Sequence, residues 1–128
     1  MAIKIDVAPG ELIDKLTILE IKKANIEDPA KLRNVAHEYD VLTRTLEAEV
    51  EETADLLELR SQLKAINETL WRIEDDIRDH ERNRDFGAGF IELARAVYHT
   101  NDKRAAVKRR INELLDSDII EEKSYAAY

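Results

Sequence analysis

Apolar residues recur every three or four positions through the middle of the chain, which is the spacing of one face of an α-helix. The longest such run begins at Leu56 and ends at Ile77. A narrow, uninterrupted seam of this kind is typical of a helix that packs against another helix. Its members are Leu56, Leu59, Leu63, Ile66, Leu70, Ile73 and Ile77. The pattern predicts long packed helices, but it carries no information about chemistry.

Two shorter helices are expected before this seam. The first follows Pro9 and Gly10, and its apolar residues occupy more than one face, so it should be buried on several sides. The second begins at Asp28, whose side chain can cap a helix, and at Pro29, which suits a first helical turn. Its apolar seam stays regular as far as Leu46.

The seam of the second helix then slips out of phase near Thr53. A threonine can cap a new helix, so the slip favours a turn within residues 51–55 over one unbroken helix. We expect the second and third helices to fold back on each other as an antiparallel hairpin. This pairing would place Tyr39 near Ile66 or Leu70.

A third helix is expected over residues 55–84, and it ends at the clearest turn in the chain, which contains Gly87. A fourth helix begins near Phe90. Its seam is apolar at both ends but polar in the middle, at Thr100 and Arg104. A new helix could be capped there. One continuous helix would match the third in length, and it is the expected form.

The N-terminal segment alternates between apolar and polar residues from Ala2 to Val7, which is typical of a β-strand. A single strand needs a partner for its backbone groups. The remaining candidates are the tail around Ile119 and Ile120 or a second subunit, and the sequence leaves both open.

Composition supports a helical protein, because charged residues make up 38% of the 128 residues while the chain has only three Gly and two Pro. The length suits one domain, which we assign to residues 1–128. The predicted fold is all-α: an antiparallel bundle of about four helices with a long coiled-coil-like hairpin and short extended termini.

The net charge of -8 argues against nucleic-acid binding, although residues 95–110 form a basic run and residues 38–58 an acidic one. There is no cysteine, which excludes disulfides and thiolate metal sites. No apolar run is long enough for a membrane span. These features predict a cytoplasmic protein.

No catalytic motif is recognisable, and three glycines are too few for a phosphate-binding or dinucleotide-binding loop. The three histidines, His37, His80 and His99, lack the spacing of metal ligands. No metal site and no cofactor are therefore predicted. Whether the chain is an enzyme stays open.

One cluster of polar residues has functional interest. When the third and fourth helices fold back about Gly87, residues equally far from the turn meet. The cluster contains Trp71, Glu74, Asp75 and Arg78 from the third helix and Tyr98, Asn101, Arg104 and Lys108 from the fourth. The third helix outruns the second here. We expect the first helix to cover the cluster, with Asp14 or Lys15 pointing inward.

This cluster has two interpretations. The simpler one is a structural network of ion pairs between helices. The other is a site for a small phosphorylated or sugar-like ligand, with Arg and Lys side chains on the phosphate.

Several stretches resemble a family of short bacterial and phage proteins that is known only as a domain of unknown function. They are PGELIDKLTILEIKKANI, LWRIEDDIR, FIELARAVYHTNDKRAAVKRRIN and the terminal EEKSY. The resemblance implies a link to surface-polysaccharide synthesis, through neighbouring glycosyltransferase genes, and it assigns no catalytic residue.

Two functional hypotheses follow. The leading one is a non-enzymatic interaction or accessory protein that forms a homodimer or binds a protein partner, because narrow seams suit helix association. The alternative is an enzyme or small-ligand binder that acts on a phosphorylated or sugar-like substrate at the polar cluster.

Overall fold

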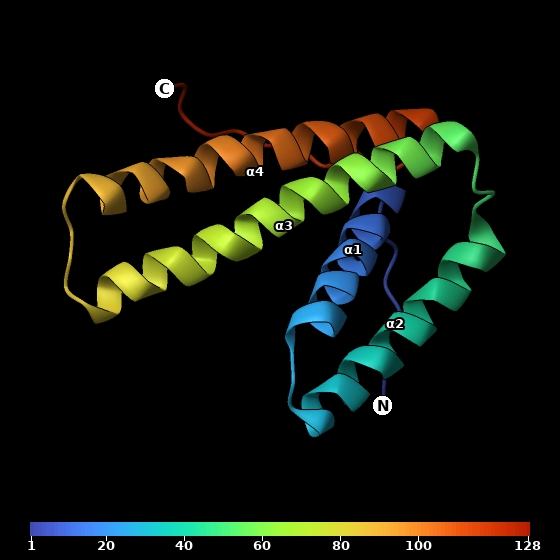
Figure 1. Ribbon diagram of the computed structural model, residues 1–128. Helices are drawn as coiled ribbons and strands as arrows, with labels where there is room; N and C mark the ends of the chain where they lie inside the picture. Colours follow the sequence, from blue (N-terminus) through green and yellow to red (C-terminus); the bar gives the residue numbers. More distant parts are fainter.

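The chain folds into four α-helices without any β-strand, as described by a computed structural model of all 128 residues (Figure 1). The helices are α1 (Pro9–Asn25), α2 (Pro29–Glu49), α3 (Ala54–Arg82) and α4 (Ala88–Leu114). The predicted all-α bundle is confirmed. None of these helices combines the length and the apolar character needed to cross a membrane.

Helices α3 and α4 form the long hairpin of the fold and run antiparallel, side by side (Figure 1). In the turn between them Arg84 adopts a left-handed backbone with φ of 52°, and the Asp85 carboxylate accepts a hydrogen bond from the Gly87 N–H. The prediction that α4 is one continuous helix is confirmed.

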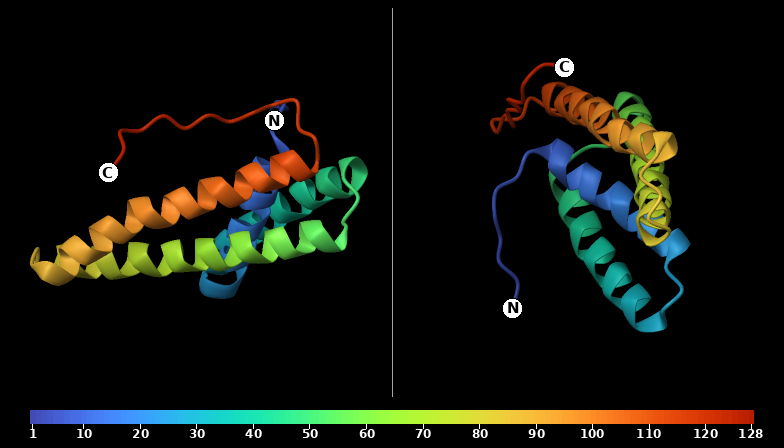
Figure 2. Two further views of the ribbon diagram at one scale, coloured as in Figure 1. Left: turned by 90° about the horizontal axis from the view of Figure 1, so that it is seen from above. Right: turned by 90° about the vertical axis from the view of Figure 1, so that its left-hand side faces the viewer.

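The second hairpin joins α1 and α2, and α1 lies between α2 and the α3/α4 pair (Figures 1 and 2). The predicted cap of α2 is present, since the Asp28 side chain accepts from the Ala30 N–H at 2.9 Å. Eight of the 17 residues of α1 are buried, and they lie on more than one face of the helix, as expected from its apolar pattern.

The helical conformation is interrupted between α2 and α3, where the apolar seam of the sequence slips out of phase. Thr53 caps α3 by accepting a hydrogen bond from the Leu56 N–H at 3.2 Å. The pairing predicted from that break is wrong, because α2 packs along α1 and diverges from α3. The many-sided apolar surface of α1 is the physical reason, since it needs cover from both neighbours. Tyr39 accordingly contacts α1, donating its hydroxyl to Glu20 at 3.1 Å.

The core lies where all four helices meet, at the end of the α3/α4 hairpin opposite its turn. It contains Leu12, Ile13, Leu16, Leu46, Leu56, Leu63, Val107 and Ile111. The other end of the hairpin extends beyond α1 and α2 (Figure 1). The bundle is therefore open on the side where the sequence predicted the polar cluster.

Ala2–Val7 was expected to pair either with the tail near Ile119 or with a second subunit, and the first of these alternatives is wrong. Residues 1–7 form no strand and no backbone hydrogen bond, and Ile3 and Ile5 are 79% and 75% exposed. The C-terminal tail, residues 117–128, instead runs back along α4 (Figure 2). Charge explains its course, because its carboxylates lie against the basic residues of that helix.

Candidate functional site

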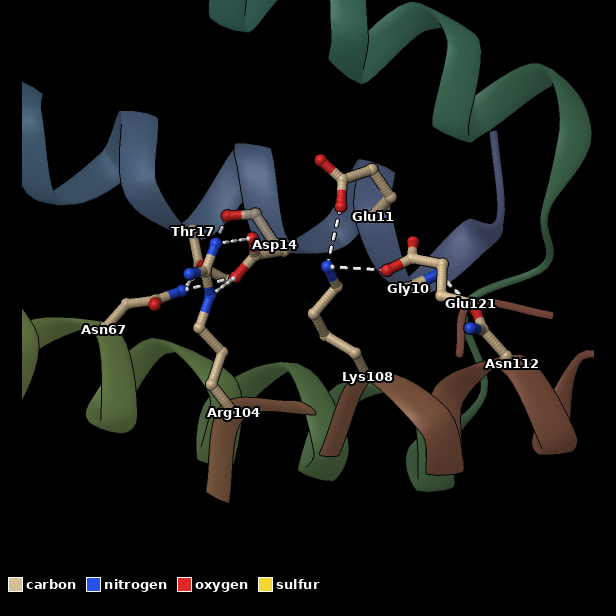
Figure 3. A network of polar contacts seen from close by, with 9 residues as sticks. All are labelled: Gly10, Glu11, Asp14, Thr17, Asn67, Arg104, Lys108, Asn112 and Glu121. Atoms are coloured by element: carbon tan, nitrogen blue, oxygen red, sulfur yellow. Dashed lines mark hydrogen bonds and ion pairs between the residues drawn. The ribbon is translucent and has the colours of Figure 1, made fainter. Parts of the chain in front are cut away.

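A buried carboxylate joins three helices at the centre of the molecule (Figure 3). Asp14 of α1 is only 1% exposed. Its Oδ1 accepts from the Asn67 side-chain amide of α3 and from Arg104 Nε of α4, each at 2.9 Å. Arg104 also donates from Nη2 to Oδ2 of the same carboxylate. The carboxylate therefore receives both donors of a bidentate guanidinium, which is the strongest form of such a pair.

Thr17 completes this network, which we call the Asp14 network. Its hydroxyl accepts from the Asn67 amide at 2.9 Å and donates to the Asp14 backbone carbonyl at 2.8 Å. Because the buried polar side chains find partners in one another, the desolvation cost of burying them is offset. The network fixes α1 against the α3/α4 hairpin.

The start of α1 rests directly on α4. The Gly10 N–H donates to Asn112 Oδ1 at 2.7 Å. A Cβ on Gly10 would lie 2.6 Å from the Lys108 carbonyl oxygen, so only glycine allows this approach. One turn away, Lys108 Nζ lies 2.6 Å from Glu11 Oε2.

Arg104 and Lys108, the two cations of α4 that contact α1, stay protonated. The hydrogen bond to Asp14 raises the pKa of Arg104 above its ordinary value, against a smaller lowering by burial. Burial would lower the pKa of Lys108, but its hydrogen bond to Glu11, with the nearby carboxylate charges, raises it overall.

A groove of about 480 Å³ opens beside the Asp14 network, and we call it the α3 groove. Its polar walls are formed by amide, carboxylate and guanidinium side chains and by one indole ring. They are Asn67, Trp71, Glu74, Arg78, Asn101 and Arg104. Arg78 pairs with Glu74 one turn away on the same helix, and that hydrogen bond raises the pKa of Arg78.

Six of the ten residues predicted for the polar cluster line the α3 groove: Trp71, Glu74, Asp75, Arg78, Asn101 and Arg104. Asp14 lies under Arg104 and points inward (Figure 3). Of the two alternatives that were expected to point inward, Asp14 or Lys15, the structure has Asp14, whereas Lys15 is exposed.

Tyr98 and Lys108 do not line the α3 groove but a second one, the tail groove, between α4 and the C-terminal tail. The prediction that both face the α3 residues is wrong. Lys108 lies on the same face of α4 as Asn101 and Arg104 but one turn further along, where Glu11 is its partner, and the Tyr98 ring packs against Tyr128 of the tail. Asn101 and Arg104 line both grooves.

Ion pairs hold the tail over α4. Lys108 Nζ is 3.3 Å from Glu121, Arg109 Nη1 is 3.7 Å from Glu122, and Lys123 Nζ is 2.7 Å from Asp102. The Tyr128 hydroxyl also donates to Asp102. The hydrogen bonds from Lys123 and then Tyr128 lower the pKa of Asp102, which keeps this carboxylate ionised.

Sequence reasoning missed three buried polar residues, Thr17, Asn67 and Asn112. Asn67 had one available signal, since it lies four residues after Leu63 and four before Trp71, on the packed side of α3. It also missed the tail, whose run of Glu121, Glu122 and Lys123 could have been matched with the basic run of α4.

No group of three or more His, Asp or Glu side chains gathers as a metal site would require. No curated protein matches the chain, and no solved structure does. The sequence model of one family matches residues 3–128 and is described as a family of unknown function, DUF6165. Because this match covers nearly the whole chain, the protein belongs to the DUF6165 family.

Proposed function

We propose that the α3 groove binds a small, hydroxyl-rich ligand such as a sugar, and that the chain is a binding or accessory protein for this ligand. The convergence of Trp71 with amide, carboxylate and guanidinium groups around one concavity carries the proposal. Its volume of about 480 Å³ lies within the range of roughly 300–1,000 Å³ that is usual for small-molecule sites.

Charge pairing favours a sugar over a phosphate. Arg104 is paired with Asp14, and Arg78 is paired with Glu74, so neither guanidinium is free to neutralise a dianion. Sugar hydroxyls donate to carboxylates and accept from amides and guanidinium groups at the same time. The apolar C–H face of a sugar ring can also pack on the indole of Trp71.

This proposal reverses the order of the two hypotheses drawn from the sequence. A purely structural network needs Asp14, Asn67 and Arg104, but it gives no role to Trp71 or Asn101 at the groove wall. A sugar-like ligand also agrees with the link to surface-polysaccharide synthesis that the resemblance implies. A cytoplasmic location belongs to the same proposal.

The test uses the intrinsic fluorescence of Trp71, which is the only tryptophan in the chain. Glucose, galactose, N-acetylglucosamine and inorganic phosphate would each be titrated at constant ionic strength. We expect a saturable change in emission with at least one sugar and none with phosphate. Asn101→Ala should weaken that binding about tenfold, the effect of losing roughly one hydrogen bond to the ligand.

A matched control is Asp76→Asn, an exposed carboxylate of α3 outside the groove, which should leave binding unchanged. Arg104→Met is unsuitable, because it would strand the buried Asp14 carboxylate and destabilise the fold in any case. A lack of response to every sugar would contradict the proposal and leave a structural network. A saturable response to phosphate alone would contradict the choice of a sugar.

Self-association is a second candidate, favoured by the N-terminal segment. Ile3, Ile5 and Val7 are exposed, and the backbone groups of residues 1–7 have no partner within the chain. Two copies could satisfy these groups by pairing their segments as antiparallel strands in a homodimer. Light scattering should then give a dimer that becomes a monomer when residues 2–7 are deleted. A full-length monomer at high concentration would contradict this candidate.

A further inference from the structure

The face of α4 under the tail carries three kinds of group in a fixed order. Tyr98 and His99 give two neighbouring aromatic rings, with centroids 4.8 Å apart and planes tilted by 41° to each other. Asp102 gives a carboxylate one turn further on, and Lys108 and Arg109 give two cations. From Tyr98 to Lys108 the helix rises about 15 Å.

The tail presents a matching group at each of these positions. The Tyr128 ring lies 5.2 Å from the Tyr98 ring, tilted by 53°, and 4.7 Å from the His99 ring, edge-on at 79°. The Tyr128 hydroxyl donates to Asp102, and the carboxylates of Glu121 and Glu122 face the two cations. The tail thus places an aromatic ring, a hydroxyl donor and two carboxylates in the tail groove. The same groups of a bound molecule would take these positions.

The tail is held loosely. Every residue from Asp118 to Tyr128 is exposed, and none of them forms a backbone–backbone hydrogen bond. Only side-chain contacts attach it to α4, and exposed ion pairs contribute little stability each. A competing ligand of similar chemistry could therefore replace it at small cost.

We propose that the tail groove is a nucleotide-binding site and that the C-terminal tail is its displaceable internal occupant. The base would stack on Tyr98, as bases do on aromatic side chains, with the His99 ring at its edge. The ribose hydroxyls would donate to Asp102, and the phosphates would lie on Lys108 and Arg109. A nucleotide carries a ring, a diol and an anion in this same order.

Lys108 supports the choice of a phosphate ligand. Its side chain is only 14% exposed. Unlike Arg78 and Arg104, which each have a single carboxylate partner, Lys108 and Arg109 each have two, so each would lose one to the departing tail and keep the other, Glu11 and Glu113 respectively. A partly desolvated ammonium gains more from a phosphate than an exposed one does. An acidic peptide from another protein is the competing occupant, and the test below distinguishes it.

The experiment is isothermal titration calorimetry of the full chain with ADP, UDP and inorganic pyrophosphate. We expect saturable binding of at least one nucleotide and weaker binding of pyrophosphate, which lacks the base and ribose. The double variant Glu121→Gln, Glu122→Gln should bind the nucleotide about fivefold more tightly, because it weakens the internal competitor. Asp118→Asn, a tail carboxylate outside every ion pair, is the matched control and should change nothing.

A second pair of variants tests the cations. Arg109→Met should weaken nucleotide binding about fivefold, whereas the neighbouring Arg110→Met, outside the groove, should not. Failure of both the wild type and the double variant to bind either nucleotide would overturn the proposal. So would equal affinity for pyrophosphate. Binding of a synthetic peptide with the sequence of residues 117–128, without nucleotide binding, would also overturn it and identify a peptide site. Asn101 and Arg104 line both grooves, but Trp71 lies only in the α3 groove and Arg109 only in the tail groove, so Trp71 fluorescence and the Arg109→Met variant report the two sites separately.

Discussion

The two flanks of α4 are both held by ion pairs, yet the pairs differ in kind. On the α1 flank, Asp14 is 1% exposed and binds Arg104 with two hydrogen bonds (Figure 3). On the tail flank, the side chains of Lys123 and Asp102 are 37% and 42% exposed, and Glu122 is 73% exposed. One helix therefore combines a buried interface with a solvated one.

The two flanks can therefore play different roles: a buried ion pair fixes the position of its side chains, whereas exposed ion pairs can exchange their partners. Removing one partner of a buried pair leaves an uncompensated charge, so the α1 flank must keep its geometry. The two partners of an exposed ion pair can separate and interact with water or salt ions instead, at little cost in free energy. The α1 flank can thus hold Arg104 at the wall of the α3 groove, while the tail flank can open.

The largest expected effect is that of Asp14→Ala. It leaves Arg104 and Asn67 without their shared acceptor, so the free energy of unfolding should fall by about 3 kcal/mol. Urea unfolding followed by circular dichroism measures this change. Asp76→Ala, an exposed site on α3, should change stability by less than about 0.5 kcal/mol. Equal effects of the two substitutions would remove the distinction between the flanks.

Gly10→Ala should have the next largest effect. Its Cβ would meet the Lys108 carbonyl at 2.6 Å and Asn112 Oδ1 at 2.8 Å, so α1 must shift away from α4 at a cost of about 2 kcal/mol. In Gly89→Ala the new Cβ meets only the movable His80 ring, at 3.1 Å. If thermal melting finds both variants equally stable, the close approach of α1 to α4 is wrong.

Attachment of the tail should depend on pH, with a smaller effect. Hydrogen bonds from Lys123 and Tyr128 lower the pKa of Asp102 in the folded protein. The stabilisation of the attached tail by the Asp102 carboxylate is therefore full above the unfolded pKa of about 3.9, and it is lost as the pH falls through the lower folded pKa. The hydrogen bond to Asp102 raises the pKa of Tyr128. The stabilisation of the attached tail by this hydrogen bond is therefore full below the unfolded pKa of about 10, and it is lost as the pH rises through the higher folded pKa.

We expect ¹⁵N relaxation of residues 121–128 to report an attached tail at neutral pH and a mobile one once the pH has fallen through the lowered pKa of Asp102. The helices should keep their signals while the tail is released. A tail whose mobility stays unchanged on acidification until the helices themselves unfold would contradict the role of Asp102. In Asp102→Asn the tail should already be more mobile at neutral pH.

The local signals in the sequence were sufficient to predict the helices. Asp28, Thr53 and the turn at Gly87 cap or end helices through contacts within a few residues, and such contacts are visible in the sequence. Pairing of α2 was predicted wrongly because apolar spacing identifies a buried face but not the helix that covers it.

The candidate site was predictable only in part. Equal rise about Gly87 brought α3 residues such as Trp71 and Glu74 to the same groove as Asn101 and Arg104 of α4. The role of Asn67 was not predictable, because its partners Asp14 and Thr17 are 53 and 50 residues away in the chain. The course of the tail depends on equally distant charges, such as Asp102 and Lys123.

The most direct test of the contrast between the two flanks is a pair of double-mutant cycles, measured by urea unfolding. One cycle combines Asp14→Ala with Arg104→Ala, and the other combines Asp102→Ala with Lys123→Ala. The account predicts a coupling of about 2 kcal/mol for the buried pair and none above experimental error for the exposed pair. Equal couplings in the two cycles, or no coupling between Asp14 and Arg104, would contradict it.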